Sequence, residues 1–417
     1  MKHIPTASLV AGLLMLAAAA HGAELHWARA WAASAQAPTQ ANGPFAGSPT
    51  FHDQTVRQVV RLNGSGRRVR VLFTNEFGTA PVAIGAAHLA LAGPGGAIRP
   101  GSDHVLTFGG KPQAVMRAGA PLLSDPVDMP VKALTRMAIS LYLPGQVDAC
   151  TCHGTSAEPG YVAAGDQTSA ASLPVAGGPG GLPRVMIAGV DVADDAPAGT
   201  IVAFGDSITD GVGATPGADR RWPDQLADRL QAAGRHDLAI ADEGISGNRV
   251  LNDGFGVSAL ARFDRDVLET PNLRYVILFE GINDIGISFM KRQAGGPLAG
   301  FMDNLPGGPV TAEDIIAGDR QLIARAHEHG AKIFGATITP YEGAATFSPE
   351  GEAARQAVNH WIRTSGAFDG VIDCDAAWRD PAHPGRIRDG LHMGDHLHGS
   401  DAGYKALAGA VDLKLFR

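Results

Sequence analysis

The sequence predicts two domains, an N-terminal β-sandwich followed by an α/β domain built on a parallel sheet. The 417 residues are long for one hydrophobic core. Apolar and polar residues alternate through much of residues 24–198, which is typical of strands with one buried and one solvated face. In residues 199–417, short continuous apolar runs alternate with helical patterns, which favours a parallel sheet covered on both faces.

The first 23 residues are typical of a cleavable signal peptide. Lys2 and His3 precede an apolar run from Ala7 to Ala20, and small residues follow it. This run is too short to span a bilayer comfortably, so a membrane anchor is the weaker interpretation. We therefore expect a secreted or periplasmic protein without a stable membrane anchor, whose mature chain starts near Glu24.

The expected β-sandwich is read from period-two segments separated by turns. Val69, Val71 and Phe73 alternate with Arg68 and Arg70, and similar patterns occupy 56–62 and 137–143. The Gly- and Pro-rich residues 175–183 indicate a surface loop or linker. No amphipathic helix is expected in this half.

The second half contains five apolar runs that predict buried parallel strands. They are Ile201–Phe204, Leu238–Ala241, Tyr275–Phe279, Lys332–Ile338 and Gly370–Asp373. Helices are expected to begin at Trp222-Pro223, at a capping box that starts with Thr311, and after Ser400. Gly234 and Gly330 are expected to end the first two of these helices.

Side chains and glycines suited to acyl transfer follow these runs. Ser207 comes after the first run, Gly247 after the second and Asn283 after the third, while Asp395 and His398 follow the fifth. Because the carboxyl ends of parallel strands meet at one edge of a sheet, we expect these residues to converge.

Their chemistry predicts a serine hydrolase. A serine hydroxyl needs a neighbouring base, and that base needs a group that orients it, so Ser207, His398 and Asp395 form a candidate triad. The amides of Ser207 and Gly247 and the side chain of Asn283 are candidate donors to an oxyanion.

Other interpretations of the same region were weighed. Asp389 and His392 have the same spacing as the chosen pair, but Asp395 and His398 lie directly before the last predicted helix. The histidine-rich segment from 392 to 398 could bind zinc, yet no matching cluster precedes it, so no metal is expected. A net charge of -8 and the lack of a basic block argue against nucleic-acid binding.

The three cysteines leave their pairing open. Cys150 and Cys152 are two residues apart, and a bridge between them would be strained. Cys374 follows an apolar run and could be buried.

Four blocks resemble the SGNH hydrolase superfamily, also called GDSL-type esterases and lipases. They are Gly205–Gly211, Gly244–Leu251, Glu280–Gly286 and Asp395–Tyr404. The resemblance covers about residues 199–417. It implies a flavodoxin-like three-layer α/β/α domain with a five-stranded sheet, ester hydrolysis through an acyl-enzyme, and no cofactor. It also assigns the triad and oxyanion roles to Ser207, Asp395, His398, Gly247 and Asn283.

The rest of the chain fits the same resemblance, with two departures. The N-terminal half, including Phe77–Pro81, is similar to the β-domain that precedes the catalytic domain in some secreted bacterial members. Asp242 stands where members often carry Asn, and Gly399 where Pro often follows the final histidine. Both departures affect loop geometry rather than catalytic groups.

We therefore expect a secreted carboxylic-ester hydrolase that acts on short-chain acyl esters, acetyl above all, including those on carbohydrates. The alternatives are a lipase or arylesterase of broader acyl range, and a catalytically silent glycan-binding protein. The expected partner is a small-molecule or carbohydrate ester. The sequence leaves the oligomeric state and the role of the β-domain open.

Overall fold

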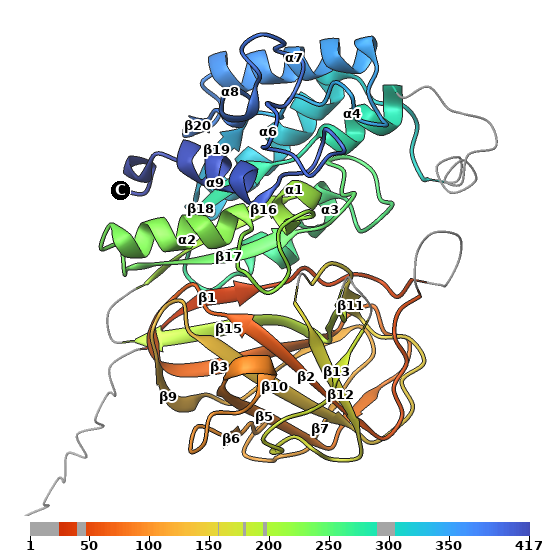
Figure 1. The fold of residues 1–417 in the computed structure, drawn as a ribbon, viewed down its shortest axis with the longest axis vertical. Coiled ribbons are helices and arrows are strands. Elements are labelled where there is room, and N and C mark those ends of the chain that lie inside the picture. The colour runs from red at the N-terminus through yellow and green to blue at the C-terminus, as the bar shows by residue number, and fades with distance from the viewer. Residues whose placement is uncertain (1–24, 40–46, 157, 178–180, 195–197, 290–304) are drawn as a thin grey trace, which may run out of the picture.

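The computed structural model describes the chain except residues 1–24, 40–46, 157, 178–180, 195–197 and 290–304. The expected signal peptide lies outside the described residues. No helix in the described ranges combines the length and the apolar character needed to cross a membrane. Strands fill the lower half of the molecule, and helices around a central sheet fill the upper half (Figure 1).

The lower half, called the β-domain, contains two main antiparallel sheets. One has the order β1 (His26–Ala32), β15 (Ile187–Asp194), β3 (Gly66–Asn75) and β8 (Ala120–Leu123), and β9 (Val127–Val131) also pairs with β3. The other has the order β13 (Val175–Ala176), β12 (Gly160–Ala164), β2 (Gln54–Arg61), β10 (Arg136–Leu143), β5 (Ala86–Leu91) and β6 (His104–Val105). Two short pairs complete it, β11 (Cys152–His153) with β14 (Arg184–Val185), and β4 (Val82–Ile84) with β7 (Ala114–Met116); η1 (Pro94–Gly96) is a single 3-10 turn.

The two sheets share one hydrophobic core, as expected for a sandwich. In β3, the side chains of Val69, Val71 and Phe73 are buried. They pack in the same cluster as Ile139 and Leu141 of β10 in the opposite sheet. The alternation along these strands therefore identifies the inner face correctly.

Two details of the β-domain differ from the sequence expectation. The segment 175–183, expected to be a loop, includes β13, whose Val175 and Ala176 pair with β12. Cys150 and Cys152 form a disulfide, although their close spacing argued against one. Their Cα atoms are 5.4 Å apart, within the ordinary range for a bridge, because the extended chain separates them sufficiently. Cys374 is buried and free.

The upper half, called the α/β domain, is built on one parallel sheet. Its order is β17 (Leu238–Gly244), β16 (Gly199–Gly205), β18 (Leu273–Phe279), β19 (Lys332–Ala336) and β20 (Gly370–Ile372), and all four pairings are parallel. This is the flavodoxin-like order, in which the first strand lies between the second and the third. The five predicted runs and the predicted fold class are confirmed.

Helices cover both faces of this sheet (Figure 1). The short α1 (Ser207–Asp210) follows β16. On one side α2 (Trp222–Ala232) packs against α9 (Asp401–Ala410), which also contacts α8 (Cys374–Trp378). Elsewhere α6 (Ala312–Glu328) packs against α3 (Ala259–Phe263) and α7 (Pro349–Thr364), and α4 (Ile282–Phe289) packs against α7. The π-helical η2 (Asp264–Leu268) continues α3, and the 3-10 turn η3 (Leu413–Leu415) follows α9.

The helix α7 is absent from the sequence prediction. Its buried side includes Arg355 and Asn359 between apolar residues, which hides the helical spacing. Both polar side chains donate to the Ile338 carbonyl oxygen at 2.8 Å, and Arg355 also pairs with Glu352 and Asp375. In contrast, the predicted caps by Thr311 and Ser400 are both present.

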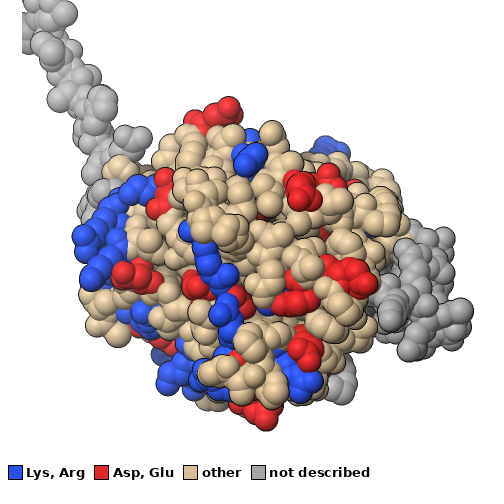
Figure 2. Space-filling model, turned by 90° about the horizontal axis from the view of Figure 1, so that it is seen from above, with Lys and Arg blue, Asp and Glu red and all other residues tan. Residues whose placement is uncertain are grey.

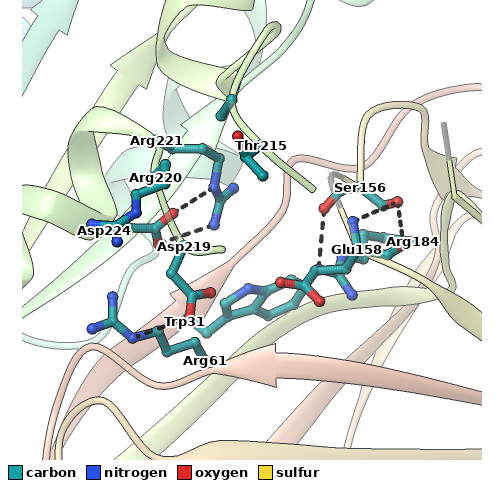
Figure 3. A pocket seen from close by; sticks show the side chains of 11 residues that line it. Trp31, Arg61, Ser156, Glu158, Arg184, Thr215, Asp219, Arg220, Arg221 and Asp224 are labelled. Atoms are coloured by element: carbon teal, nitrogen blue, oxygen red, sulfur yellow. Dashed lines mark hydrogen bonds and ion pairs between the residues drawn. The ribbon is translucent and has the colours of Figure 1, made fainter. Parts of the chain in front are cut away.

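The two domains are in direct contact along β1 and β17 (Figure 1). The strand β17 lies at the edge of its sheet, yet all seven of its residues are buried because the β-domain covers it. A Cβ atom on Gly64 would lie 2.8 Å from the Cβ of Ala239, so glycine permits this close approach. Figure 3 shows polar side chains of both domains at one part of the contact, where Arg61 faces Asp219.

Candidate active site

Ser207 lies at the carboxyl end of β16, as the first residue of α1. The preceding Asp206 caps this helix by accepting a hydrogen bond from the Ile208 amide at 2.9 Å. A Cβ atom on Gly205 would lie 2.2 Å from Thr209 Oγ1 and 2.6 Å from the Phe279 carbonyl oxygen. The tight turn therefore requires glycine and fixes the direction of the Ser207 side chain, which is only 5% exposed.

A chain of two hydrogen bonds connects Ser207 to His398 and Asp395. His398 Nε2 lies 2.8 Å from Ser207 Oγ, and His398 Nδ1 lies 2.6 Å from Asp395 Oδ2. The other oxygen of Asp395 accepts hydrogen bonds from the amides of Leu397 and His398, both at 3.0 Å. The structure thus brings together three residues that are up to 191 positions apart in the sequence.

The surroundings of Asp395 keep it ionised. Partial burial alone would raise the pKa of this carboxyl group. The hydrogen bonds from the His398 side chain and from two backbone amides outweigh burial and hold the pKa well below its usual range. A negative Asp395 orients the imidazole ring and compensates for a positive charge on it.

The alternative pair, Asp389 and His392, does not reach Ser207 in the described structure. His392 Nδ1 accepts hydrogen bonds from the amides of Gly394 and His396 at 3.1 and 3.3 Å. Its ring also lies against the ring of His396, with 4.3 Å between centroids. His392 therefore shapes the loop that carries His398.

The three candidate oxyanion donors lie at the ends of successive strands. Ser207 follows β16, Gly247 follows β17, and Asn283 lies in the first turn of α4 after β18. Neither the Ser207 amide nor the Gly247 amide donates to another described residue. Asn283 Nδ2 donates one hydrogen to the Asn248 carbonyl oxygen at 2.9 Å, which leaves its second hydrogen for a ligand.

Gly247 is constrained in two ways. Its φ angle is 79°, in the left-handed region that favours glycine. A Cβ atom at this position would also lie 2.5 Å from the ring of Phe255. The loop around Gly247 is therefore shaped for a backbone amide without a side chain.

Two residues that sequence reasoning did not single out hold these loops together. The buried guanidinium of Arg262 donates to the Gly205 carbonyl oxygen and to Asn248 Oδ1, both at 2.9 Å. The carboxylate of Asp284 accepts from the amides of Val250 and Leu251 at 2.7 and 3.3 Å. Asp284 lies in the Glu280–Gly286 block, although no role was assigned to it there. For Arg262, the one signal in the sequence is Asp266 four residues later, with which it forms an i, i+4 ion pair.

The two departures from the resembled pattern have local explanations. Asp242 forms a salt bridge with Arg221 across 3.0 Å. Gly399 lies where a Cβ atom would approach the rings of Trp378 and Tyr404, both to 2.9 Å. The absence of a side chain at 399 lets the last helix pack closely behind His398.

A cavity of about 400 Å³ borders the loop that carries Gly247. Its walls come from both domains, with Gln36 and Thr155 from the β-domain and Val212, Ser246 and Phe255 from the α/β domain. The exposed lining is more apolar than polar, and it includes none of Ser207, Asn283 and His398. Within the described residues, no three His, Cys, Asp or Glu side chains are grouped closely enough to hold a metal ion.

A parallel α/β/α sheet with Ser207, His398 and Asp395 joined at its carboxyl edge is the arrangement of a serine hydrolase. Residues 203–406 match the GDSL-like lipase/acylhydrolase family. The α/β domain of this protein belongs to that family and thus to the SGNH hydrolase superfamily.

The solved structures found by comparison each cover about half of this chain. An acetylxylan esterase from Geobacillus stearothermophilus is 24% identical and covers 51% of this chain and 91% of its own, with a TM-score of 0.37. An alpha/beta hydrolase enzyme from the metagenome of Lake Arreo, Spain, is 22% identical over 51% of this chain and 94% of its own, with a TM-score of 0.37. No match was found among curated proteins.

Proposed function

We propose that the protein is an exported serine esterase that cleaves carboxylic esters through an acyl-enzyme. The observation that carries this proposal is the continuous hydrogen-bond chain from Asp395 through His398 to Ser207 Oγ. Membership of the acylhydrolase family supports ester substrates.

The geometry supports a two-step reaction. In the first step, His398 Nε2 accepts the hydroxyl proton as Ser207 Oγ attacks the ester carbonyl carbon. The carbonyl oxygen becomes an oxyanion, and the amides of Ser207 and Gly247 and the side chain of Asn283 donate to it. The tetrahedral intermediate then collapses, the bond to the alcohol breaks, and His398 returns the proton to the leaving alkoxide.

The second step regenerates the enzyme. A water molecule gives a proton to His398 as its oxygen attacks the acyl carbon on Ser207. The second tetrahedral intermediate releases the carboxylic acid, and the proton returns to Ser207 Oγ. Throughout both steps the ionised Asp395 stabilises the imidazolium form of His398, whose charge appears only transiently.

We further propose that the preferred substrates carry short acyl groups, acetyl above all, including acetyl esters of carbohydrates. Membership of the acylhydrolase family and the presence of an additional β-domain beside the α/β domain support this preference.

A hydrolysis panel tests both parts of the proposal. Nitrophenyl esters of increasing acyl length are compared with acetylated xylan and other acetylated sugars, using wild type and Ser207→Ala. We expect the highest kcat/KM for acetyl esters and no turnover above background for Ser207→Ala. A preference for long acyl chains would instead identify a lipase. Failure of Ser207 to react with a serine-directed fluorophosphonate would indicate a silent, ligand-binding domain.

Export is a separate proposal that rests on residues 1–23. Expression of the full chain in a bacterial host should place the protein outside the cytoplasm with a new N-terminus near Glu24. N-terminal sequencing of the recovered protein measures this. Retention of Met1 in a membrane-bound protein would contradict it.

A further inference from the structure

The loop that carries Gly247 is held in place by contacts of Ser246, and these contacts extend to the β-domain. The inference drawn from them rests on the proposed esterase function. The amide and the hydroxyl of Ser246 both donate to Asp210 Oδ2, at 3.0 and 2.6 Å. Because the only hydroxyl hydrogen of Ser246 is used in this way, the contact of 2.9 Å to Thr155 Oγ1 has Thr155 as its donor. Ser246 supplies the carbonyl half of the peptide group that ends in the Gly247 N–H, so holding Ser246 fixes that donor.

Asp210 connects this loop to the nucleophile. It is the last residue of α1, the helix that Ser207 begins, and it is only 2% exposed. Its Oδ2 atom binds Ser246, while its Oδ1 atom lies 3.0 Å from His153 Nε2. One carboxylate therefore links the helix of the nucleophile, the oxyanion loop and a residue of the β-domain.

His153 belongs to β11 of the β-domain and is 4% exposed. Its Nδ1 atom lies 3.0 Å from the Ser34 carbonyl oxygen, and its Nε2 atom faces the carboxylate of Asp210. A carbonyl oxygen and a carboxylate only accept hydrogen bonds, so both ring nitrogens carry hydrogen and the ring is an imidazolium.

The electrostatics agree with this assignment. Burial alone would lower the pKa of His153, but the adjacent Asp210 raises it above its ordinary value. Burial alone would raise the pKa of Asp210, but His153 lowers it. The two groups therefore form a buried ion pair between the domains, and removal of one partner would leave the other unpaired.

A second contact from the β-domain reaches the same loop. Gln36 Nε2 donates to the Phe255 carbonyl oxygen at 2.8 Å, and the ring of Phe255 packs on Gly247. The Gln36 side chain is itself fixed, since its Oε1 atom accepts from the Gly154 amide at 2.7 Å. The segment from Cys152 to Thr155, together with Gln36, thus supports the oxyanion loop from the side of the β-domain.

We infer that His153 is a positioning residue of the active site, which acts through Asp210 to fix the Gly247 amide for the transition state. On this view the β-domain is a part of the catalytic apparatus as well as a neighbour of it. The ring of His153 does not touch the reacting atoms, so its effect falls on the orientation of a donor.

The test compares three variants of the full chain in hydrolysis of nitrophenyl acetate. His153→Phe keeps a planar aromatic ring but removes both hydrogen bonds. His153→Gln retains a terminal NH2 that can still donate to Asp210. Arg61→Ala is the matched control, because it breaks the ion pair with Asp228 elsewhere between the domains.

We expect His153→Phe to lower kcat by about 10–100-fold with KM changed less than about threefold, as for a misplaced catalytic group. His153→Gln should recover most of the loss. Arg61→Ala should lower the melting temperature while leaving kcat close to that of the wild type, because this contact does not reach Ser246.

The outcomes separate this inference from the proposed function. Wild-type protein that hydrolyses no ester better than Ser207→Ala would overturn the esterase assignment. An active wild type combined with unchanged kcat in His153→Phe would overturn only the positioning role, as would a loss that Gln does not recover. If His153→Phe fails to fold, His153→Asn takes its place, because its short amide can still donate to the Ser34 carbonyl oxygen but does not reach Asp210; it must lower kcat for the inference to stand.

Discussion

At the scale of single residues, two carboxyl groups of the site differ in how readily they bind a proton. Asp395 is held ionised beside His398 by three hydrogen bonds. Asp206 lies next to the nucleophile, where burial raises its pKa to about 7 even though nearby His398 opposes the shift. The carboxylate that orients the base and the one that caps the nucleophile helix therefore have opposite preferences for a proton.

Removal of the nucleophile or the base should abolish turnover without unfolding the protein. We expect Ser207→Ala and His398→Ala each to lower kcat by about 10⁴–10⁶, and the double variant to be little worse, because the two act as a unit. His392→Ala is the control and should be much milder. Measurement of kcat beside far-ultraviolet circular dichroism checks this, and an inactive His392→Ala with an active His398→Ala would show that the wrong histidine was chosen.

The side chain of Asn283 should matter mainly in the transition state. Its free amide hydrogen is available to the oxyanion, so Asn283→Ala should lower kcat by about 10²–10³ with little change in KM. Steady-state kinetics on one acetyl ester measure both constants. A large rise in KM at constant kcat would instead identify Asn283 as a substrate-binding group.

At the scale of elements, β17 combines an edge position with complete burial. The β-domain covers it, and the strand carries Asp242 and Glu243 into this buried contact. Glu243 binds the hydroxyl of Ser34 from the β-domain at 2.6 Å, and Asp242 pairs with Arg221. Edge strands need protection from other chains, and here the protecting surface is a domain of the same chain.

The buried position of Asp242 predicts a pH-dependent stability. Burial raises its pKa to about 7, although Arg221 opposes the shift, while the unfolded chain has a value of about 3.9. Between these values the folded protein holds a proton that the unfolded protein releases, so this group lowers stability as pH rises through that window. Above about pH 7 its unfavourable contribution is complete.

We therefore expect Asp242→Asn to resemble the wild type near pH 4 and to become more stable than the wild type as pH rises to 7 and beyond. Urea unfolding at pH 4.5, 6 and 8 measures the difference at each pH. A variant that is destabilised most at pH 8 would show that the ion pair with Arg221 outweighs the burial of the charge.

At the scale of the whole molecule, the two domains are closely docked, and residues of both surround the candidate active site. Their contact includes the close approach of Gly64 to Ala239, the ion pairs of Arg61, and the contacts of His153 and Thr155 with the catalytic loops. On the face seen from above, acidic and basic side chains are interspersed (Figure 2).

Tight docking of the domains predicts that Gly64 cannot be replaced. In Gly64→Ala the new methyl group would meet Ala239 at 2.8 Å, and we expect a loss of about 1–3 kcal/mol, as for overpacking in a core. Gly145→Ala is the control, because a Cβ atom there meets nothing within 4 Å. Chemical unfolding of both variants measures the effect, and equal stability of the two would mean that the contact adapts freely.

Activity should not depend on a metal ion, because the proposed triad supplies its own base. We expect turnover to survive prolonged dialysis against a chelator and elemental analysis to find no stoichiometric zinc. If chelation abolishes activity and zinc alone restores it, the histidines of residues 392–398 become candidate zinc ligands.

The residue pattern alone was enough to locate the parallel strands and the edge of the sheet at which the site lies. Continuous apolar runs predict parallel strands, and the carboxyl ends of such strands share one edge. The positions of Ser207, Gly247, Asn283 and His398 relative to these runs were therefore sufficient to predict that they meet. The helix caps at Thr311 and Ser400 could also be predicted, because each depends only on neighbours within one helical turn.

The distant groups that support the site can be identified only in the folded molecule. His153 meets Asp210 across 57 positions and a domain boundary, and no pattern along the sequence records such a pairing. The helix α7 was hidden because Arg355 and Asn359 are buried against the backbone of Ile338, so their polarity suggested the opposite of their position. Burial of a polar group depends on the partner that satisfies it, and that partner is supplied by folding.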